Sequence, residues 1–516
     1  MKQKAIAEIY HQETKYYECE MAKHQRPLDW SSQPSPYKSY HTEKKIDLVP
    51  YLPLRNNPFT EKPIEPVLED KGYPFGIGAI SRLLYFTNGV TGILQYPNGQ
   101  SLSLRAAPTA GGLYPTECYI AVRDVSTLDD GVYNFQVKDH SLVPVWEGNF
   151  WSEFEKYCLG HEAIGQSQLL VILTAVYRRS AWRYHERAYR RILLDTGHVL
   201  GNLFAYAHEE SFSPCPIAGF VDKLLNRLLF LEEAEEGVLF VVALPQHQPN
   251  NVLRHDALMA SSSHPLSDID WHEDAENPLL LRLHQSSSML PEEPSAASDE
   301  EQLPEPSQAE GPSQAEEKYA IKPKVLLSGA PIDWQNSMGP TILLRRSTRA
   351  YLGKSCSKEV LSSILEYAYP SPDVTSLVDA SLLETYLVIQ RVEGVDAGVY
   401  YYAPEQKSLR TIYSGDFKNQ TWHFCLGQDL AKDAAALVIH TAFLKDALMR
   451  YGNRAYRYLH LDAGYIGQRI NLAAIRLGLG VSGIGGFYDD EVNALLGLSL
   501  EHIIVYITTL GQPYGQ

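Results

Sequence analysis

Apolar and polar residues follow two different periods along the chain, and together they predict an α+β fold. Residues 76–88 are apolar at the three- and four-residue spacing of a helix, and a long helix is expected over about 181–208. Short apolar runs rich in β-branched residues predict strands at 118–123, 131–135, 169–175 and 238–244. These helices and strands define a first domain at residues 76–250.

The first 75 residues differ from this pattern. A helical run, Ala5–Lys23, is followed by a stretch rich in Pro, Ser and Tyr at 28–40. Turn-forming residues without an apolar period do not build a core of their own. We therefore expect residues 1–75 to be an N-terminal arm that packs on a domain.

A second non-periodic region lies at 251–330 and is predicted to be a linker. Its segment 285–318 is rich in Pro, Ser, Glu and Gln, and nine acidic residues lie between positions 291 and 318 against one lysine. This acidic run carries −8 of the net charge of −17. Because such a composition cannot bury enough apolar surface to fold, segment 285–318 is expected to be disordered.

The pattern then repeats, which predicts a second domain at 331–516. Shifting the first half by 267 positions brings it onto the second without gaps: Gly131–Tyr133 falls on Gly398–Tyr400, and Arg187–Arg190 falls on Arg454–Arg457. Chance does not keep one register over a hundred residues. The chain is therefore predicted to be an internal duplication of one α+β domain.

Composition excludes several classes of protein. The 516 residues are 44% hydrophobic, and no apolar run has the length of a membrane span. No basic stripe with interleaved aromatic residues is present, so a nucleic-acid partner is not expected. The six cysteines form no CxxC pair, and no signal pattern precedes residue 30. These features predict no metal site, no membrane partner and a reducing, cytoplasmic location.

Two stretches carry candidate chemistry. Residues 105–115 read RAAPTAGGLYP, where small residues and glycines allow a backbone to approach a flat ligand closely. Residues 345–351 read RRSTRAY, where forked arginine donors suit a phosphate. The alternatives are a tight turn that enters a strand for the first stretch, and a solvated basic cluster at a helix N-terminus for the second.

The duplication fails at these two stretches. At the shift of 267, Pro108–Pro115 falls on Thr375–Leu382, which reads TSLVDASL and has no Gly-Gly pair. The arginine segment has no counterpart in the first half, where the matching region near 60–75 contains no arginine. Each half has kept one element and lost the other.

Together the two stretches resemble the nitroreductase-type flavoprotein superfamily, and within it the SagB-type dehydrogenases that oxidise azoline rings in peptides. The spacing R-x-Y-R-x-x-x-L-D-x-G-H at Arg187–His198 resembles the same branch. The resemblance implies two domains, each an antiparallel-rich sheet wrapped by helices. Enzymes of this type are homodimers with FMN at the subunit interface, so one chain with two domains is expected to form a pseudo-dimer.

The resemblance also implies which residues bind FMN. The second half is expected to hold the phosphate and a turn near the flavin ring with Arg345, Arg346, Ser347, Arg349, Gly485, Gly486 and Phe487. The first half is expected to supply the other turn with Arg105, Pro108, Thr109, Ala110, Gly111 and Gly112. Since only one pairing of the halves unites both sets, one FMN per chain is predicted.

The expected catalytic residues are Tyr184 and its neighbour Arg183. The SagB-like branch often has Lys-Tyr here, thought to remove the ring proton, whereas this chain has Arg183-Tyr184, repeated as Arg450-Tyr451. Arginine does not act as a base at neutral pH. Tyr184 can do so if Arg183 lowers its pKa, with Tyr451 as the second candidate. The alternative is that both tyrosines pack on their helices.

These residues predict an FMN-dependent dehydrogenase that converts peptide thiazolines or oxazolines to thiazoles or oxazoles, within a possible complex with a cyclodehydratase. Two other functions fit the same residues. One is an NAD(P)H-dependent reductase of nitro groups, quinones or alkenes. The other is a non-catalytic subunit of a peptide-modifying complex.

Overall fold

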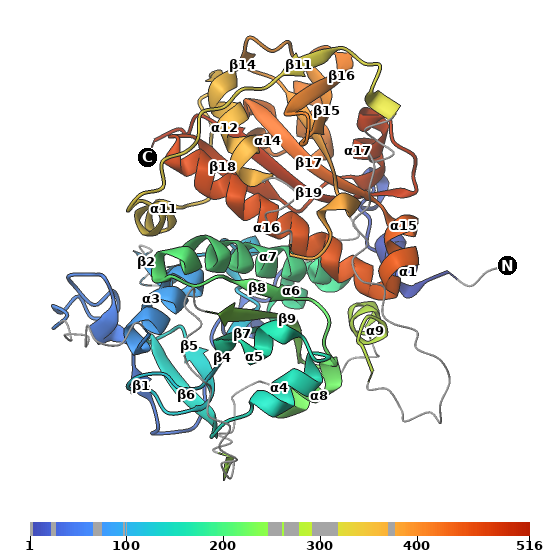
Figure 1. Cartoon of the computed structure of the whole chain (residues 1–516). Helices are drawn as coiled ribbons and strands as arrows, with labels where there is room; N and C mark the ends of the chain where they lie inside the picture. The colour runs from blue at the N-terminus through green and yellow to red at the C-terminus, as the bar shows by residue number, and fades with distance from the viewer. Residues whose placement is uncertain are drawn as a thin grey trace.

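The computed structural model forms two sheet-and-helix units, with two long helices side by side between them (Figure 1). The residues that the structure describes are 4–21, 27–65, 75–95, 99, 101–245, 261–262, 278–290, 318–369 and 377–515. Within these ranges no helix is both long enough and apolar enough to cross a membrane. All six cysteines lie in the described ranges and none is in a disulfide.

The first half is built on an antiparallel sheet whose strands run in the order β1-β6-β5-β4-β7-β9-β8, with β10 beside β6. The strands are β1 (Ile46–Asp47), β4 (Thr116–Val122), β5 (Gly131–Gln136), β6 (Ser141–Glu147), β7 (Ser167–Val176), β8 (Cys215–Ile217), β9 (Glu236–Pro245) and β10 (Ser261–Ser262). The central strands β4, β5, β7 and β9 are almost wholly buried, which explains why they are nearly continuous apolar runs rather than alternating ones.

The second half repeats this sheet strand for strand, in the order β11-β16-β15-β13-β17-β19-β18. Its strands are β11 (Lys324–Leu326), β13 (Glu384–Ile389), β15 (Gly398–Ala403), β16 (Ser408–Ser414), β17 (Ala436–Phe443), β18 (Gly480–Ile484) and β19 (His502–Gly511). The register repeats too, because Tyr119 pairs with Ile172 and Tyr386 pairs with Ile439, each 267 positions later. The predicted duplication and α+β class are confirmed.

Helices cover both sheets. In the first half they are α3 (Ile77–Asn88), α4 (Trp151–Tyr157), α5 (Glu162–Gly165), α6 (Tyr177–Tyr184), α7 (Ala188–Ala207) and α8 (Asp222–Leu228). In the second half they are α11 (Met338–Leu344), α12 (Lys358–Ala368), α13 (Lys418–Phe424), α14 (Asp429–Asp433), α15 (Leu444–Tyr451), α16 (Ala455–Arg476) and α17 (Asp489–Leu496). Two small additions flank the sheets: the hairpin β2 (Val90–Gln95) with β3 (Ser101–Arg105), and the pair β12 (Cys356–Ser357) with β14 (Val392–Glu393).

Helices α7 and α16 form the centre of the contact between the halves (Figure 1). They cross at Gly197 and Gly464, which are equivalent at the shift of 267. A Cβ atom at Gly197 would collide with the carbonyl of Leu461, and one at Gly464 with the carbonyl of Leu194. The two backbones therefore approach more closely than any side chain would permit, so the halves pack as a pseudo-dimer.

Two buried ion clusters also join the halves. Asp489, the first residue of α17, accepts hydrogen bonds from Nη1 of Arg187 at 2.8 Å and Nη1 of Arg190 at 2.6 Å. The equivalent carboxylate, Asp222, begins α8 and accepts from Nη1 of Arg454 at 2.7 Å and Nη1 of Arg457 at 2.6 Å. Burial alone would raise the pKa of each carboxylate, but the arginines outweigh it and lower both pKa values. The R-x-Y-R spacing is thus an interface motif.

The predicted helix at 181–208 is interrupted. Helix α6 ends at Tyr184, a 3-10 turn follows, and α7 begins at Ala188, because His185 has a left-handed φ of +48°. The second half breaks at the equivalent Gly452, with φ +55°. A left-handed residue lets two consecutive helices take different directions, which periodicity alone does not reveal.

The predicted arm and linker both need correction. The arm's helix, α1 (Ile6–Glu13), ends well before the predicted helical run does, and residues 22 and 23 of that run lie outside the described residues. The linker contains an ordered helix, α9 (Leu279–Ser286), and residues 285–290 of the segment expected to be disordered belong to it or follow it. Buried Leu280 and Leu283 pack this helix on the core, which explains its order. Residues 291–317 of the predicted disordered segment lie outside the described residues.

Helices α1 and α9 are counterparts. The stretch HQET at 11–14 matches HQSS at 284–287, a shift of 273. Arg190 Nη2 donates to the carbonyl of His11, and Arg457 Nη2 donates to the carbonyl of His284. Each half therefore begins with its own arm, and the predicted linker contains the second one. Both arms lie against the junction of the halves (Figure 1).

Candidate active site between the halves

The arginine segment and the small-residue turn meet, although 240 residues separate them. Buried Arg345 donates from Nε to the carbonyl of Ala106 at 2.8 Å and from Nη2 to the carbonyl of Arg105 at 3.1 Å. Arg346 donates from Nη2 to the carbonyl of Thr91 at 2.9 Å. The only pairing of halves that unites the two predicted elements is therefore the one that forms.

The arginine segment follows the C-terminus of α11 and does not begin a helix, which differs from the helix N-terminus considered as the alternative setting. Burial, followed by the effects of Arg346 and Arg349, lowers the pKa of Arg345 to about 10, so its guanidinium stays charged at neutral pH. Arg349 is exposed and Ser347 is half-buried. Several positive charges thus gather beside the turn, as a phosphate site requires.

The turn at 108–112 is held by one carboxylate. Thr109 Oγ1 donates to Asp195 Oδ2 at 2.6 Å, and the N–H of Ala110 donates to the same carboxylate at 3.1 Å. The N–H of Ala110 is therefore occupied within the protein. Burial raises the pKa of Asp195 to about 7, although these hydrogen bonds act to lower it. Pro108 and Gly112 are half-buried.

Gly111 is the position where glycine is required. Its φ is +69°, and a Cβ atom there would lie 2.7 Å from Oη of Tyr184 and 3.4 Å from Cδ of Arg183. Any side chain at this position would be strained and would displace Tyr184. The predicted turn and the predicted catalytic pair are thus brought into contact.

Tyr184 lies between two guanidinium groups. The central carbon of Arg191 is 3.8 Å from the ring centroid, and that of Arg183 is 5.7 Å away. Burial raises the pKa of Tyr184, and the opposing effect of Arg191 and Arg183 does not overcome it. Arg183 does act to lower this pKa, as the role of Tyr184 as a base requires, but burial outweighs it, because removing a phenolate from water costs more free energy than the two guanidinium groups restore.

Arg191, which the sequence reasoning missed, connects Tyr184 to the predicted turn at Gly485 and Gly486. A Cβ atom at Gly485 would lie 3.4 Å from Nε of Arg191, and one at Gly486 would lie 3.7 Å from Nη2. Within the described part of the chain, Nη1 of Arg191 is buried without a hydrogen-bond partner. This donor is available to an acceptor that a ligand would supply, since buried polar groups normally have a partner.

Two predicted ligands point elsewhere. The Arg105 side chain donates to the carbonyl of Pro36 and lies between the rings of Tyr37 and Tyr114, so only its backbone reaches the arginine segment. Phe487 packs against the guanidinium of Arg187 at 4.9 Å and belongs to the buried ion cluster. The structure does not place either side chain beside the Gly485–Gly486 turn and Tyr184.

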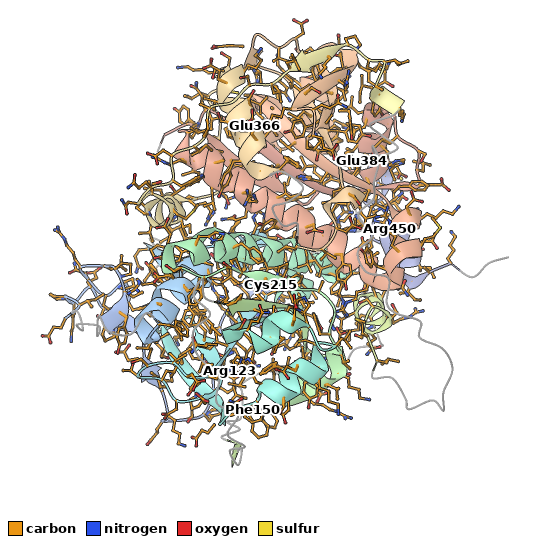
Figure 2. The ribbon with its side chains drawn as sticks, in the orientation of Figure 1. Arg123, Phe150, Cys215, Glu366, Glu384 and Arg450 are labelled. Carbon is orange, nitrogen blue, oxygen red and sulfur yellow. The ribbon has the colours of Figure 1, made fainter. Side chains whose placement is uncertain are left out.

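The equivalent place in the second half is closed by its own side chains. Tyr451 Oη donates to Asp379 Oδ2 at 3.1 Å, and Arg450 forms an ion pair with the same carboxylate at 3.0 Å. Burial, followed by the charge of Asp379, raises the pKa of Tyr451 to about 12. Arg450 lies on α15 in the second half (Figure 2). The side chains of Tyr451 and Arg450 are thus engaged with Asp379 within their own half.

His198, which ends the R-x-Y-R-x-x-x-L-D-x-G-H motif, packs across the contact between the halves. Its Nε2 lies 2.9 Å from Oη of Tyr506, and its Nδ1 lies 2.9 Å from Oε1 of Gln468, both in the second half. Burial lowers the pKa of His198 to about 4, so the ring is neutral. Comparison at the shift of 267 could have singled out Arg191 and His198, since they fall on Tyr458 and Tyr465.

Comparison with known proteins supports this arrangement. The model of the nitroreductase family matches residues 77–244 and 342–512. MJ1384 of Methanocaldococcus jannaschii, a provisionally assigned nitroreductase, is 33% identical over 161 residues, which cover 30% of this chain and 81% of that protein. The microcin B17-processing protein McbC of Escherichia coli is 23% identical over 142 residues, 27% of this chain and 52% of its own length.

A solved structure agrees over the whole molecule. The crystal structure of a provisionally assigned nitroreductase from Anabaena variabilis is 37% identical and superposes with a TM-score of 0.83, over 99% of this chain and 100% of that chain. The likeness therefore includes both halves and their mutual placement. With one family match in each half, this chain belongs to the nitroreductase family as a tandem pair of its domains.

Proposed function

We propose that the protein is an FMN-dependent oxidoreductase of the SagB type, which oxidises thiazoline or oxazoline rings in a peptide to thiazoles or oxazoles. The observation that carries the proposal is the contact of Arg345 with the backbone of Arg105 and Ala106, which unites a cationic segment and a glycine turn at one junction. Members of the nitroreductase family typically bind flavin.

The residues at this junction fit FMN. Arg345, Arg346, Ser347 and Arg349 would hold the phosphate, because several positive charges are needed to balance a dianion. The turns at Gly111–Gly112 and Gly485–Gly486 would flank the flat ring, and the unpaired Nη1 of Arg191 offers a donor to a carbonyl oxygen. A set of cationic donors beside two glycine turns suits this cofactor.

Aromatisation of an azoline ring removes one hydride and one proton from neighbouring ring atoms. FMN, when bound, supplies the acceptor of the hydride. Tyr184 is our candidate for the group that receives the proton on Oη, since it faces the turn at Gly111. Its raised pKa keeps the phenol protonated in the resting protein, so Arg191 and Arg183 would have to stabilise the phenolate during turnover.

The substrate class is supported by the similarity to McbC, whose name describes the processing of microcin B17. A peptide substrate and a cyclodehydratase partner are proposed on that ground and on the motifs at 105–115 and 187–198. The similarity to McbC and these motifs also favour dehydrogenation of an azoline over the alternative NAD(P)H-dependent reductase activity.

The test is reconstitution with FMN followed by three measurements. We expect one FMN per chain from the flavin absorbance, conversion of an azoline-containing peptide to the azole by mass spectrometry, and no consumption of NAD(P)H in that reaction. Rapid NAD(P)H oxidation with a quinone and no azole formed would identify a reductase instead. A protein that stays colourless would support the non-catalytic role.

A further inference from the structure

The N-terminal arm places the side chain of Tyr16 near the candidate active site. Beyond α1, the carbonyl of Thr14 accepts from Nη1 of Arg187 at 2.6 Å, and the N–H of Tyr16 donates to Asp489 Oδ2 at 3.4 Å. The guanidinium carbon of Arg187 lies 4.2 Å from the centroid of the Tyr16 ring. The arm is thus fastened to the ion cluster at Thr14 and at Tyr16.

Tyr16 and Arg191 lie close enough to interact electrostatically, and both neighbour Tyr184, whose ring centroid is 3.8 Å from the guanidinium carbon of Arg191. Among the described residues, the charged and titratable groups near Tyr16 include Arg187, Arg190 and Arg191, together with Asp489 and Tyr184. Burial raises the pKa of Tyr16, but Arg191 and Arg187 outweigh burial and lower the pKa below its ordinary value of 10.0. The pKa shifts of the two tyrosines near Arg191 therefore have opposite signs, since the pKa of Tyr184 is raised.

The second half provides an internal control for this pair. Met289 occupies the place of Tyr16 on the second arm, and its N–H donates to Asp222 Oδ2 at 2.8 Å, as that of Tyr16 does to Asp489. Tyr458 occupies the place of Arg191, and its hydroxyl donates to the carbonyl of Ala218 at 3.0 Å. Both positions differ between the halves while the backbone contact to the ion cluster stays the same, so that contact does not depend on Tyr16 or Arg191.

The pair occurs at the junction that holds both the glycine turn and the arginine segment. We infer that Tyr16 and Arg191 form one unit of the active site: Arg191 binds a carbonyl oxygen of the bound ligand through Nη1, and Tyr16 is a positioning residue that holds its guanidinium against the Gly485–Gly486 turn. The inference rests on the proposed function. The carbonyl belongs either to the flavin ring or to the peptide substrate, and the experiment separates the two.

The first test requires no flavin. Tyr16→Phe keeps the ring beside Arg187 and removes only the hydroxyl. Spectrophotometric titration of wild type against Tyr16→Phe is expected to show one additional tyrosine that ionises below pH 10.0, and Arg191→Leu is expected to raise the pH at which this tyrosine ionises. Tyr458→Phe, the matched variant in the second half, should leave the titration of this tyrosine unchanged. If Tyr16→Phe titrates as wild type does, the pair does not exist.

The second test identifies the ligand of Arg191. A charged hydrogen bond is worth roughly tenfold or more in affinity. If the carbonyl belongs to the flavin, Arg191→Leu should weaken FMN binding by about tenfold and shift the flavin absorption spectrum. If it belongs to the substrate, FMN binding should stay at the wild-type value while KM for the azoline peptide rises by about tenfold.

Tyr16→Phe should change the same parameter as Arg191→Leu, either FMN affinity or KM, but by a smaller factor. It should also shift the alkaline limb of the pH profile of azoline oxidation. An Arg191→Leu enzyme with wild-type FMN affinity, spectrum and KM overturns the inference. Failure of the wild-type protein to bind FMN would instead overturn the proposed function, and the tyrosine titration would still decide whether the pair exists.

Discussion

The two halves share their scaffold and differ in their chemistry. Asp195 and Asp462 both cap the turn before the first central strand, and Asp489 and Asp222 both pair with two buried arginines. The glycine turn, the arginine segment and the pair of Tyr16 with Arg191 occur once each. The two turn-capping carboxylates and the two ion clusters occur in both copies, whereas the elements that we propose to bind a ligand occur in one.

The reason lies in what each loss would cost. Removing one member of a buried ion cluster leaves an uncompensated charge, which destabilises the fold by several kcal/mol. Losing a ligand-binding turn does not destabilise the fold when neighbouring side chains form new contacts. In the second half, Arg450 and Tyr451 both donate hydrogen bonds to Asp379. An internal duplication therefore separates folding requirements from functional ones within one chain, and the following variants test that separation.

The largest effect is expected at Gly111. Gly111→Leu would place a side chain at φ +69° against Oη of Tyr184, so bound FMN should be lost completely. The flavin-to-protein absorbance ratio measures this loss, and circular dichroism checks the fold. Val378→Leu, at the equivalent position in the second half, should leave the ratio unchanged. Normal flavin content in Gly111→Leu would contradict the assignment of this turn.

The next effect concerns the ion clusters. Asp489→Ala and Asp222→Ala should each lower the free energy of unfolding by about 3–5 kcal/mol, because two guanidinium groups stay buried without a partner. Since the native pKa of each carboxylate is lowered, its contribution is present above the ordinary value of 3.8 and is lost as pH falls through the native pKa. Denaturant unfolding measures both variants, and very unequal losses would show that the halves are not equivalent here.

The catalytic tyrosines should differ sharply. Tyr184→Phe is expected to keep FMN and to lower kcat for azoline oxidation by about 10²-fold or more, the usual contribution of a proton-transferring group. Tyr451→Phe loses a hydrogen bond to Asp379 and should retain full turnover. Mass spectrometry of the peptide product gives both rates. Undiminished turnover in Tyr184→Phe would assign Tyr184 to packing.

A pH dependence that both halves should share is expected to be the smallest of these effects over any single pH unit. Burial raises the pKa of Asp462 and of Asp195 to about 7, so each favours the protonated native state, and stability falls as pH rises from the ordinary value of 3.8 towards 7. Each group contributes at most about 1.4 kcal/mol per pH unit. Asp462→Asn and Asp195→Asn should each flatten this slope in unfolding experiments between these two pH values. A steeper slope in either variant would mean that its carboxylate is ionised in the native state.

Periodicity and the repeat predicted much of the fold because they report burial directly. The four strands read from apolar runs are β4, β5, β7 and β9, and the helix predicted at 76–88 is α3. The break at His185 was not predicted, since a left-handed residue other than glycine leaves no mark on the apolar period. The second arm was also missed, because only Leu280, Leu281 and Leu283 of its short helix face the core beside an acidic, non-periodic stretch.

The sequence and the tertiary structure likewise contributed different parts of the candidate site. The sequence by itself determined that each half lacks one of two elements, because a shift of 267 positions makes a missing Gly-Gly pair or a missing arginine visible. Only the tertiary structure decided which side chains converge on that junction. Arg105 and Phe487 sit next to the right residues in sequence yet turn into the arm and the ion cluster, whereas Tyr16 and Arg191 come from places 175 positions apart. Adjacency in the chain fixes where a backbone goes, but the direction of a side chain depends on the charges and surfaces that fold around it.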